Sequence, residues 1–432
     1  MATAGKSMNT GDFKYLLRRA VAEIIIEEKM VKLLKSGKKL RLKFGLDPSA
    51  PDLTLGHTVV FRKLRQFQEL GHQVILIVGD WTAQIGDPSG VSATRRMLSA
   101  EEVKANADTY MKQFFMVVDR ERTDIKWQSE WFGDFDLADV VRLTSKFTVA
   151  QFLARDDFNK RFNDGKPIAI TELLYPLMQA YDSVAINADV EFGGTDQKFN
   201  LLVGRELQSM MGQAPQQIFM TPLLVGTDGV QKMSKSLGNY IGIAEPPEDI
   251  YGKTMSITDA LIMPYFELLT DVPDKELDEI KKEFDNGTNP MELKKRLARE
   301  IVTQLYSGNE AGEAEKHFEK VVQNKEVPDE TVVVTDKELA ELERESRKGN
   351  EPVIETGRIE SNGLRPEGYM VSISQLLLNK NLVKSKSEAR RLIAQDAVNI
   401  DDNTITDDYN IVKVGSIIRV GKRRFIRAIN KD

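Results

Sequence analysis

The sequence predicts an α/β protein whose first domain is built on a parallel β-sheet. Two short runs of the buried-strand type, 41–47 and 72–80, flank a helical stretch at 58–71, and this order is the βαβ unit of a parallel sheet. Most of the chain from about 100 to 325 has helical periodicity, and an acid-rich segment broken by Pro and Gly then precedes a small C-terminal region. We therefore expect a Rossmann-like domain, a helical middle domain and a small α+β domain.

The same patterns place the elements and boundaries along the chain. Residues 12–40 have apolar side chains at helical spacing, and strand-like segments interrupt the helical region at 125–128 and 216–225. The expected division is 1–230 for the Rossmann-like domain, 231–325 for a glycine-flanked loop and the helical domain, 326–368 for an acidic, partly ordered linker, and 369–432 for the C-terminal domain.

Composition narrows the class of protein. The chain has 432 residues, of which 41% are hydrophobic, so it can bury a substantial core in two or three domains. It has no run of about 18 apolar residues, and its first ten residues lack the apolar core of a secretory signal. Since cysteine is absent, disulfides, thiolate metal sites and a cysteine nucleophile are excluded. These features predict a cytoplasmic location.

Charge is distributed unevenly along the chain. The formal net charge is -6, yet residues 369–432 hold 12 Lys and Arg against 7 Asp and Glu. The C-terminal region is therefore basic, which suits a nucleic-acid partner that the whole-chain charge would not suggest.

Two polar loops leave the carboxyl ends of the first two predicted strands. GLDPSAPDLTLGH, residues 45–57, enters a helix whose first turn holds Gly56 and His57, and a helix N-terminus with a glycine suits an anion. An ordinary βα turn also explains those residues taken alone. The next loop, VGDWTAQIGDPSG at 78–90, contains Asp87, which either holds a ligand ammonium or caps a helix. In parallel sheets ligands bind where both loops emerge.

A third stretch, ITELLYPLMQAYDSVAIN at 170–187, has a polar stripe on an otherwise apolar helix. Tyr175, Gln179 and Asp182 stand at i, i+4 and i+7 and so share one face. Buried polar groups need partners, so this face meets either neighbouring polar elements or a polar ligand. The segment EFGGTDQ follows, and its glycines permit a close approach to the backbone at a helix start.

The stretch VQKMSKSLGN, residues 230–239, carries two lysines and two serines between glycines. The ammonium groups of a mobile loop of this kind can close on a polyphosphate. A run of charged residues is, however, more often a solvent-exposed surface without a ligand.

Taken together, TLGH at 54–57 and KMSKS at 232–236 resemble the two signatures of the class I aminoacyl-tRNA synthetases, in the right order and about 175 residues apart. KFGLDPSAPDLTLGH, IGDPSG, YPLMQAYDSVAINADVEFGGTDQKFN and KMSKSLGN are similar to the tyrosine-specific branch of that family. The resemblance covers essentially the whole chain, and ISQLLLNKNLVKSKSEARRLIAQDAVNIDD is similar to the RNA-binding module of ribosomal protein S-four type.

The resemblance implies a role for each candidate residue. Asp182 would accept the phenol hydrogen of tyrosine, Gln197 would hold the carboxyl group, Asp47 would sit beside the reacting centre, and three residues would hold the ammonium: Asp87, Tyr175 and Gln179. The predicted catalytic group is Thr54, Gly56, His57, Lys232 and Lys235. The predicted ATP site is Gly56, His57, Gly194, Asp196, Lys232, Ser234, Lys235 and Ser236.

The implied reaction is attack of the tyrosine carboxylate on the α-phosphate of ATP, followed by transfer of tyrosyl to the tRNA 3′ end. A carboxylate is already a nucleophile, so no general base is assigned, and charge stabilisation on the phosphates is the main requirement. Mg²⁺ is expected to accompany ATP, with no dedicated metal site and no prosthetic group in the protein. The family also implies a homodimer and no membrane partner.

Two positions depart from the family pattern. Lys43 stands where a tyrosine often gives the substrate hydroxyl a second partner, and Thr54 stands where a histidine often contacts pyrophosphate. Lys43 either points into the pocket and pairs with Asp182, or points away and leaves Asp182 to recognise the hydroxyl with less help.

The basic tail is expected to bind RNA through one face, and phosphate contacts should make binding weaken with salt. The predicted RNA-binding residues are Lys384, Lys386, Arg390, Arg391, Arg423 and Arg424.

Three other functions remain open from the sequence. A tryptophan-specific relative shares both signatures but does not need the Tyr-Gln-Asp stripe, and a small-molecule adenylyltransferase has no use for an RNA-binding tail. An inactive regulatory relative would bind RNA without turning over ATP.

Lys235→Ala is expected to slow adenylate formation far more than it weakens tyrosine binding, because the ammonium would act on charge that develops in the transition state. Pyrophosphate exchange measures the first quantity and equilibrium dialysis the second. Equal losses in both would contradict the transition-state role.

Overall fold

The computed structural model describes residues 15–49, 52–89, 97–323, 331–348, 368–421 and 424–430. The chain forms two compact units, Met1–Gly312 and Glu313–Asp432, and each is described here by itself.

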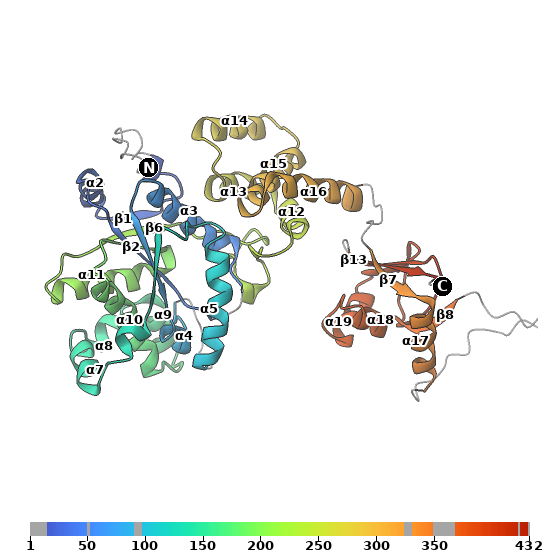
Figure 1. Ribbon diagram of the computed structural model, residues 1–432, viewed down its shortest axis with the longest axis horizontal. Helices are drawn as coiled ribbons and strands as arrows, with labels where there is room; N and C mark the ends of the chain where they lie inside the picture. Colours follow the sequence, from blue (N-terminus) through green and yellow to red (C-terminus); the bar gives the residue numbers. More distant parts are fainter. Residues whose placement is uncertain are drawn as a thin grey trace, which may run out of the picture. The chain divides into compact units, whose positions relative to one another are not determined.

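The first unit is built on a six-stranded sheet in the order β1-β6-β5-β2-β3-β4 (Figure 1). All neighbours pair in parallel except β1, which is antiparallel to β6. The strands are β1 (Glu23–Ile25), β2 (Arg41–Leu46), β3 (Gln73–Val78), β4 (Thr123–Trp127), β5 (Val190–Gly194) and β6 (Gln217–Thr221). This confirms the predicted Rossmann-like parallel sheet. The strand order reverses between β2 and β5, so the chain has its topological switch point there.

Helices cover both faces of this sheet. Phe44 of β2 contacts Phe61 and Phe114 on one face, while the neighbouring Lys43 reaches the opposite face, as period-2 alternation requires. On the Phe44 side lie α3 (Leu55–Glu69) and α5 (Ala100–Phe114), and on the Lys43 side lie α10 (Ile170–Ala185) and α11 (Lys198–Met210). The remaining helices of the sheet region are α2 (Glu27–Lys35), α4 (Thr82–Ile85), α6 (Ser129–Phe132), α7 (Leu137–Thr144), α8 (Val149–Leu153) and α9 (Asp156–Asn163).

Two elements of the first unit differ from the sequence prediction. The predicted helix at 12–40 is interrupted, because the β-branched run at 23–25 pairs with the edge strand β6 before α2 begins. Strand β5 was not predicted, since VEFGG has little alternation and two glycines. Its pairing with both β2 and β6 makes it a strand.

The helical middle region follows β6. Its helices are α12 (Pro247–Met255), α13 (Ile262–Leu269), α14 (Asp274–Asp285), α15 (Pro290–Leu305) and α16 (Gly308–Phe318), with 3₁₀ turns η2 (Lys235–Leu237) and η3 (Asp259–Leu261). Pro247 and Pro290 stand in the first helical turn, where a missing N–H costs no hydrogen bond.

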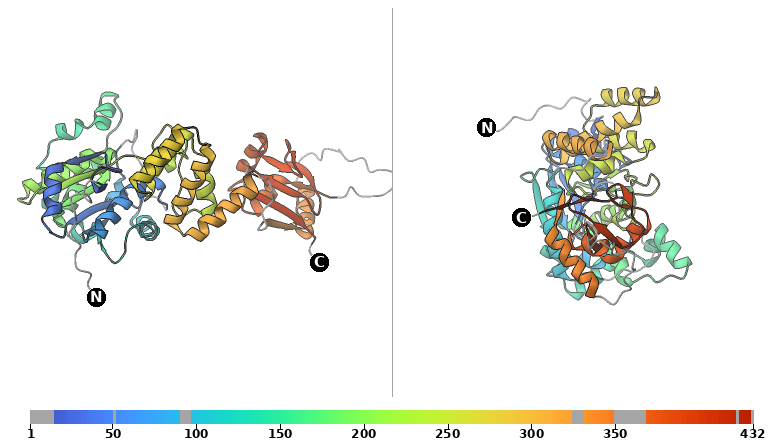
Figure 2. Two further views of the ribbon diagram at one scale, coloured as in Figure 1. Left: turned by 90° about the horizontal axis from the view of Figure 1, so that it is seen from above. Right: turned by 90° about the vertical axis from the view of Figure 1, so that its right-hand side faces the viewer.

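The second unit is a small α+β domain around one apolar cluster (Figure 2). Its five-stranded sheet has the order β10-β9-β12-β13-β7, and β11 pairs with β8 in a separate ribbon. The strands are β7 (Val332–Thr335), β8 (Tyr369–Ser372), β9 (Val398–Ile400), β10 (Asn403–Thr404), β11 (Tyr409–Val412), β12 (Ile417–Val420) and β13 (Arg424–Ile429). The helices are α17 (Asp336–Lys348), α18 (Ile373–Asn379) and α19 (Lys386–Ala394).

The predicted linker at 326–368 is wrong in its middle part. β7 pairs in parallel with β13, and Val334, Leu339 and Leu342 belong to the core of the second unit. The acid-rich composition reflects the exposed face of α17, while its apolar side chains are buried in this core.

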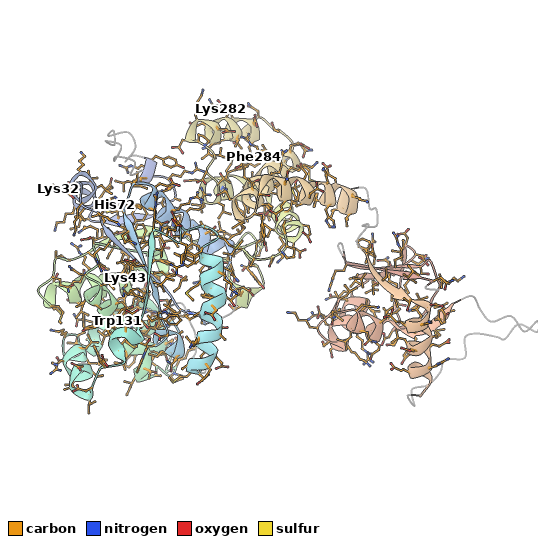
Figure 3. All side chains as sticks on the ribbon, in the orientation of Figure 1. Lys32, Lys43, His72, Trp131, Lys282 and Phe284 are labelled. Carbon is orange, nitrogen blue, oxygen red and sulfur yellow. The ribbon has the colours of Figure 1, made fainter. Side chains whose placement is uncertain are left out.

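A buried ion pair joins the two strands at the switch point. The Lys43 Nζ lies 2.8 Å from a Glu191 carboxylate oxygen, and neither side chain is more than 1% exposed. Nζ also donates to the Gln179 carbonyl at 2.6 Å and to the Ser183 hydroxyl at 2.8 Å, both on α10. The Glu191 carboxylate accepts further from Gln179, Ser183 and Gln216. The pair thus joins β2, β5 and α10 in one polar network; Figure 3 labels Lys43.

Lys43→Met is expected to destabilise the first unit by about 3–5 kcal/mol, because it leaves Glu191 charged and unpaired in the core. Urea denaturation followed by tryptophan fluorescence measures this, since all three tryptophans stand between positions 81 and 131.

Two variants serve as controls for this prediction. The double variant Lys43→Met/Glu191→Gln removes both charges and should recover most of the loss. Lys126→Met breaks an exposed i,i+4 pair with Glu130 and should cost at most about 1 kcal/mol. If the single and double variants at position 43 are equally unstable, the lost ion pair is not the cause.

Candidate active site

The candidate site lies where β2, β3 and β5 end, at the switch point of the sheet. Asp47 directly follows β2, Gly79 follows β3, and Asp196 stands in the 3₁₀ turn η1 (Thr195–Gln197) after β5. The polar stripe of α10 faces the same region, because Tyr175 bonds to Asp47. The structure therefore brings together four segments that are far apart in the sequence.

Asp47 is the centre of a partly buried hydrogen-bond group. The Tyr175 hydroxyl donates to it at 2.7 Å, and the Thr82 hydroxyl donates at 2.7 Å to its other oxygen. Burial raises the pKa of Asp47 to about 7 despite these two donors. A Cβ on Gly79 would lie 2.2 Å from the Asp47 carboxylate and 2.3 Å from the Thr82 hydroxyl, so only glycine leaves them room.

Asp182 is held by two donors that were not predicted from the sequence. The Gln128 amide donates to it at 2.9 Å and the Trp131 indole N–H at 3.2 Å. Burial raises the pKa of Asp182 to about 7, and the nearby Lys43 charge opposes that rise. Gln128 directly follows β4, and Trp131 stands in the short helix α6 just after it. Asp87 was selected because polar residues that follow a strand lie at the ligand-binding edge of the sheet, and the same criterion would also have selected these two residues.

Lys43 neither pairs with Asp182 in the pocket nor points away from the core, which were the two expected orientations. Its ammonium is fully buried and bonded to Glu191 instead of Asp182, so it acts on Asp182 only through its charge. Figure 3 labels Lys43 on the central sheet and Trp131 nearer to its carboxyl end. The sequence did not reveal this pairing because Glu191 belongs to the strand that we missed.

Asp87 and Gln197 are in direct contact. The Gln197 amide donates to the Asp87 carboxylate at 2.6 Å, and the Ser89 backbone N–H donates to its other oxygen at 2.8 Å. Asn200 donates to the Gln197 carbonyl oxygen, and the buried Arg155 contacts both Asn200 and Ser89. This chain of contacts orients the Asp87 carboxylate and the Gln197 amide beside each other. Arg155 and Asn200 were not predicted.

Thr54 and His57 form a capping box at the start of α3. The Thr54 backbone N–H donates to His57 Nδ1 at 3.1 Å, and the Thr54 hydroxyl lies 3.0 Å from the same atom. Since Nδ1 accepts, the ring proton is on Nε2. Burial, helped by the Lys235 charge, lowers the pKa of His57 to about 4, so the ring is neutral at pH 7. Thr54 itself is buried, and its contacts position His57.

The loop that carries Lys232 and Lys235 lies against the start of α3 and against the 3₁₀ turn η1. A Cβ on Gly56 would meet the Met233 side chain at 3.8 Å, and the Lys232 ammonium pairs with Asp196 at 3.0 Å. Asn239 fixes the loop by accepting from the Ser234 N–H and donating to Asp228, while the Ser234 and Ser236 hydroxyls share a hydrogen bond. A Cβ added at Gly194 would lie 2.8 Å from the Asp196 carboxylate.

The predicted RNA-binding residues belong to the second unit. Lys384, Lys386, Arg390 and Arg391 are exposed in or just before α19. Arg424 is partly buried, and its guanidinium donates to the Leu382 carbonyl. Arg423 lies outside the described residues.

Within the described ranges, no three His, Cys, Asp or Glu side chains gather in a way that could hold a metal ion. No helix in the described part of the chain has the length and hydropathy needed to cross a membrane.

Residues 35–323 match the family described as tRNA synthetases class I (W and Y). The chain is 58% identical to the tyrosine–tRNA ligase of Dehalococcoides mccartyi strain CBDB1 over 96% of its own length and 98% of the relative's. It is 48% identical to that of Thermotoga maritima over 95% and 96% of the two chains.

Solved structures with a similar fold carry related descriptions. A tyrosyl-tRNA synthetase from Archaeoglobus fulgidus, complexed with L-tyrosine, has a TM-score of 0.57 at 24% identity and covers 71% of this chain and 99% of its own. A truncated mitochondrial one from Coccidioides posadasii has a TM-score of 0.60 at 22% identity, over 72% and 92%. At these identities the likeness concerns the fold.

Gly79→Ala is expected to cost about 1–3 kcal/mol and to displace the Asp47 carboxylate, because the new methyl group overlaps it. Gly45→Ala on the adjacent strand is the matched control, since a Cβ there meets nothing within 4 Å. Thermal unfolding of both variants measures the difference. A Gly79 variant as stable as the Gly45 variant would show that the site can relax around the methyl group.

Proposed function

The chain belongs to the class I tRNA synthetases of the tryptophan and tyrosine type, and from this premise we propose how its site works. The enzyme is an ATP-dependent tyrosine–tRNA ligase. It activates L-tyrosine with ATP to tyrosyl-adenylate and pyrophosphate, and it then transfers tyrosyl to the 3′ end of its tRNA. The proposal concerns the role of each residue, the place of Mg²⁺, the oligomeric state and the location.

The observation that carries the proposal is the buried Asp182 carboxylate on the polar face of α10. Gln128 and Trp131 occupy one lone pair on each of its oxygens, and the remaining lone pairs can accept the substrate phenol O–H. At the other end of this face, Asp87 and Tyr175 would hold the substrate ammonium with Gln179, and Gln197 would hold its carboxylate. Recognition of a hydroxyl by a buried acceptor penalises phenylalanine, which would leave Asp182 unpaired.

The first step forms a bond between a tyrosine carboxylate oxygen and the α-phosphorus and breaks the bond to the pyrophosphate oxygen. Gly194 and Asp196 would hold the ribose. His57, being neutral, would donate from Nε2 to a phosphate oxygen, while Lys232 and Lys235 would neutralise the leaving pyrophosphate. Ser234 and Ser236 are hydroxyl donors in the same loop.

We assign Asp47 to the reacting end of the pocket and leave it without a proton-transfer role. Its Tyr175 and Thr82 contacts hold it in place beside the carboxyl ends of the strands. Mg²⁺ would arrive with ATP and supply charge neutralisation, while the lysines and His57 would orient the leaving group.

In the second step a ribose hydroxyl at the tRNA 3′ end attacks the tyrosyl carbonyl, and AMP leaves. We propose that RNA phosphates would be contacted by the exposed cations in or just before α19, namely Lys384, Lys386, Arg390 and Arg391, together with Arg423 and Arg424. We place the enzyme in the cytoplasm, where its tRNA and ATP are found.

A homodimer is supported by exposed apolar side chains between α7 and the start of α10. Leu137 and Ile170 are 78% and 79% exposed, and Val141, Val149 and Phe162 are more than half exposed. Large apolar side chains gathered in one stretch are typical of a protein interface. Sedimentation of the purified chain would give the subunit number directly.

Amino-acid-dependent exchange of labelled pyrophosphate into ATP tests the proposal. Tyrosine, tryptophan and phenylalanine are compared side by side at saturating ATP and Mg²⁺. Exchange with tyrosine alone would support the assignment. Exchange with tryptophan would reassign the pocket, and exchange with none, by a folded chain that still binds RNA, would favour a regulatory relative.

Tyrosine binding is expected to weaken about 10-fold between pH 8 and pH 6, because the Asp182 carboxylate becomes protonated through its pKa of about 7. Lys43 lowers that pKa and Glu191 raises it, so both groups set the midpoint.

The stability of the unliganded protein has the opposite pH dependence to tyrosine binding. The pKa is raised above its unfolded value, so the stabilising contribution present at low pH is lost as pH rises through 7.

Equilibrium dialysis with labelled tyrosine across this range measures the effect. Asp47 also titrates near pH 7, so Asp47→Asn is the control and should retain the dependence. A flat wild-type profile would show that Asp182 recognises the phenol in both protonation states.

A further inference from the structure

The ammonium of Lys235 is buried in the structure without a conventional partner. Its Nζ is shielded from solvent and makes no hydrogen bond to any residue that the structure describes. Burial lowers the pKa of Lys235, and the charge of Asp52 opposes this. A desolvated cation is costly unless some group stabilises it.

The group that faces this ammonium is the ring of Tyr110. Nζ lies 5.6 Å from the ring centroid, within the range of a cation–π interaction. Tyr110 is 6% exposed and stands on α5, far from the Lys235 loop in sequence. No role was predicted for it, because a tyrosine at helical spacing among apolar residues is normally a core residue.

The packing of α5 holds this ring in position. Val103, Ala107, Tyr110 and Phe114 belong to the buried face of the helix. Phe114 contacts Phe44 of β2 and Phe61 of α3 on the same face of the sheet. The helix start is fixed by a capping box between Ser99 and Glu102. Tyr110 is therefore part of a rigid element, whereas Lys235 belongs to a loop.

A ring face and a carboxylate hold an ammonium with different consequences. The Lys232 ammonium is paired with Asp196, so that contact must be given up when either group binds a ligand. The Tyr110 ring instead attracts the charge of Lys235 through its π-electrons, and Nζ donates no hydrogen bond to a described protein acceptor. These donors stay available for phosphate oxygens.

We propose that Tyr110 is a positioning residue that holds the Lys235 ammonium at the phosphate subsite through its ring face. The inference deepens the proposed function and rests on it, since it assigns Lys235 to the pyrophosphate that leaves. Tyr110 itself touches no reacting atom. Its contribution is to reduce the freedom of Lys235 before the transition state forms.

The first test is a double-mutant cycle on the full-length enzyme. Tyr110→Met replaces the ring with a flexible apolar side chain, and Tyr110→Phe keeps the ring face. Pre-steady-state adenylate formation is measured for both, alone and combined with Lys235→Ala. We expect Tyr110→Met to slow adenylate formation by about 2- to 30-fold, tyrosine affinity to change little, and Tyr110→Phe to restore most of the rate.

In the Lys235→Ala background the Tyr110→Met change should have less than about a 2-fold effect, because the cation is already gone. An equal loss in both backgrounds would overturn the proposal. A loss with Tyr110→Phe as large as with Tyr110→Met would also overturn it. Phe67→Leu removes a buried ring that packs on Phe192 and Phe219, and it controls for the general effect of losing a core aromatic group.

A second measurement does not depend on tolerance of Tyr110→Met by the fold. Phenylalanine with one, two or three ring fluorines at position 110 keeps the shape and progressively weakens the π-face. Adenylate formation should fall in that order if the ring binds the cation, and an unchanged rate across the series would overturn the proposal. Wild-type exchange with tyrosine is measured first, so failure of the proposed function is distinguished from failure of this inference.

Discussion

The site depends on one buried ion pair, Lys43 with Glu191, at the point where the strand order of the sheet reverses. Removing two charges from water is costly, and the cost is offset only when every donor and acceptor finds a partner. Here the partners are Gln179 and Ser183 on α10 and Gln216 before β6. The network therefore fixes α10 against β2 and β5, and the functional face of α10 is oriented as a consequence.

The carboxylates of Asp47 and Asp182 on this framework both have a raised pKa because they are desolvated, yet their surroundings differ. Asp47 receives hydroxyl donors from Tyr175 and Thr82. Asp182 receives an amide and an indole N–H, and it lies near the Lys43 charge. A nearby cation favours the ionised form of Asp182 at a depth where burial alone would favour the neutral one. The sheet network thus sets the geometry of the pocket and also its charge.

The phosphate end of the site uses a different arrangement, in which a rigid helix start and a loop meet. The capping box holds His57 in one tautomer at the start of α3, and Gly56 lets Met233 of the loop approach closely. Both lysines of the loop rest on groups of the first unit, Lys232 on Asp196 and Lys235 on the Tyr110 ring. These two contacts couple the loop to the first unit, and under the proposed function polyphosphate would replace or complete them.

The sequence alone determined the βαβ start, the parallel sheet, the polar face of α10 and the two motif loops, because these depend on local periodicity and on residues close together in the chain. Asp87, Asp182 and His57 were singled out in this way, whereas Asp47 was named only through the resemblance to the family. Tertiary structure alone decided the strand at 190–194, the pairing of Lys43 with Glu191, the Gln128 and Trp131 contacts, and the inclusion of β7 and α17 in the second unit. Each of these joins residues that are far apart in the chain, so no local pattern records the partner, and burial and hydrogen bonding select it only when the chain is folded.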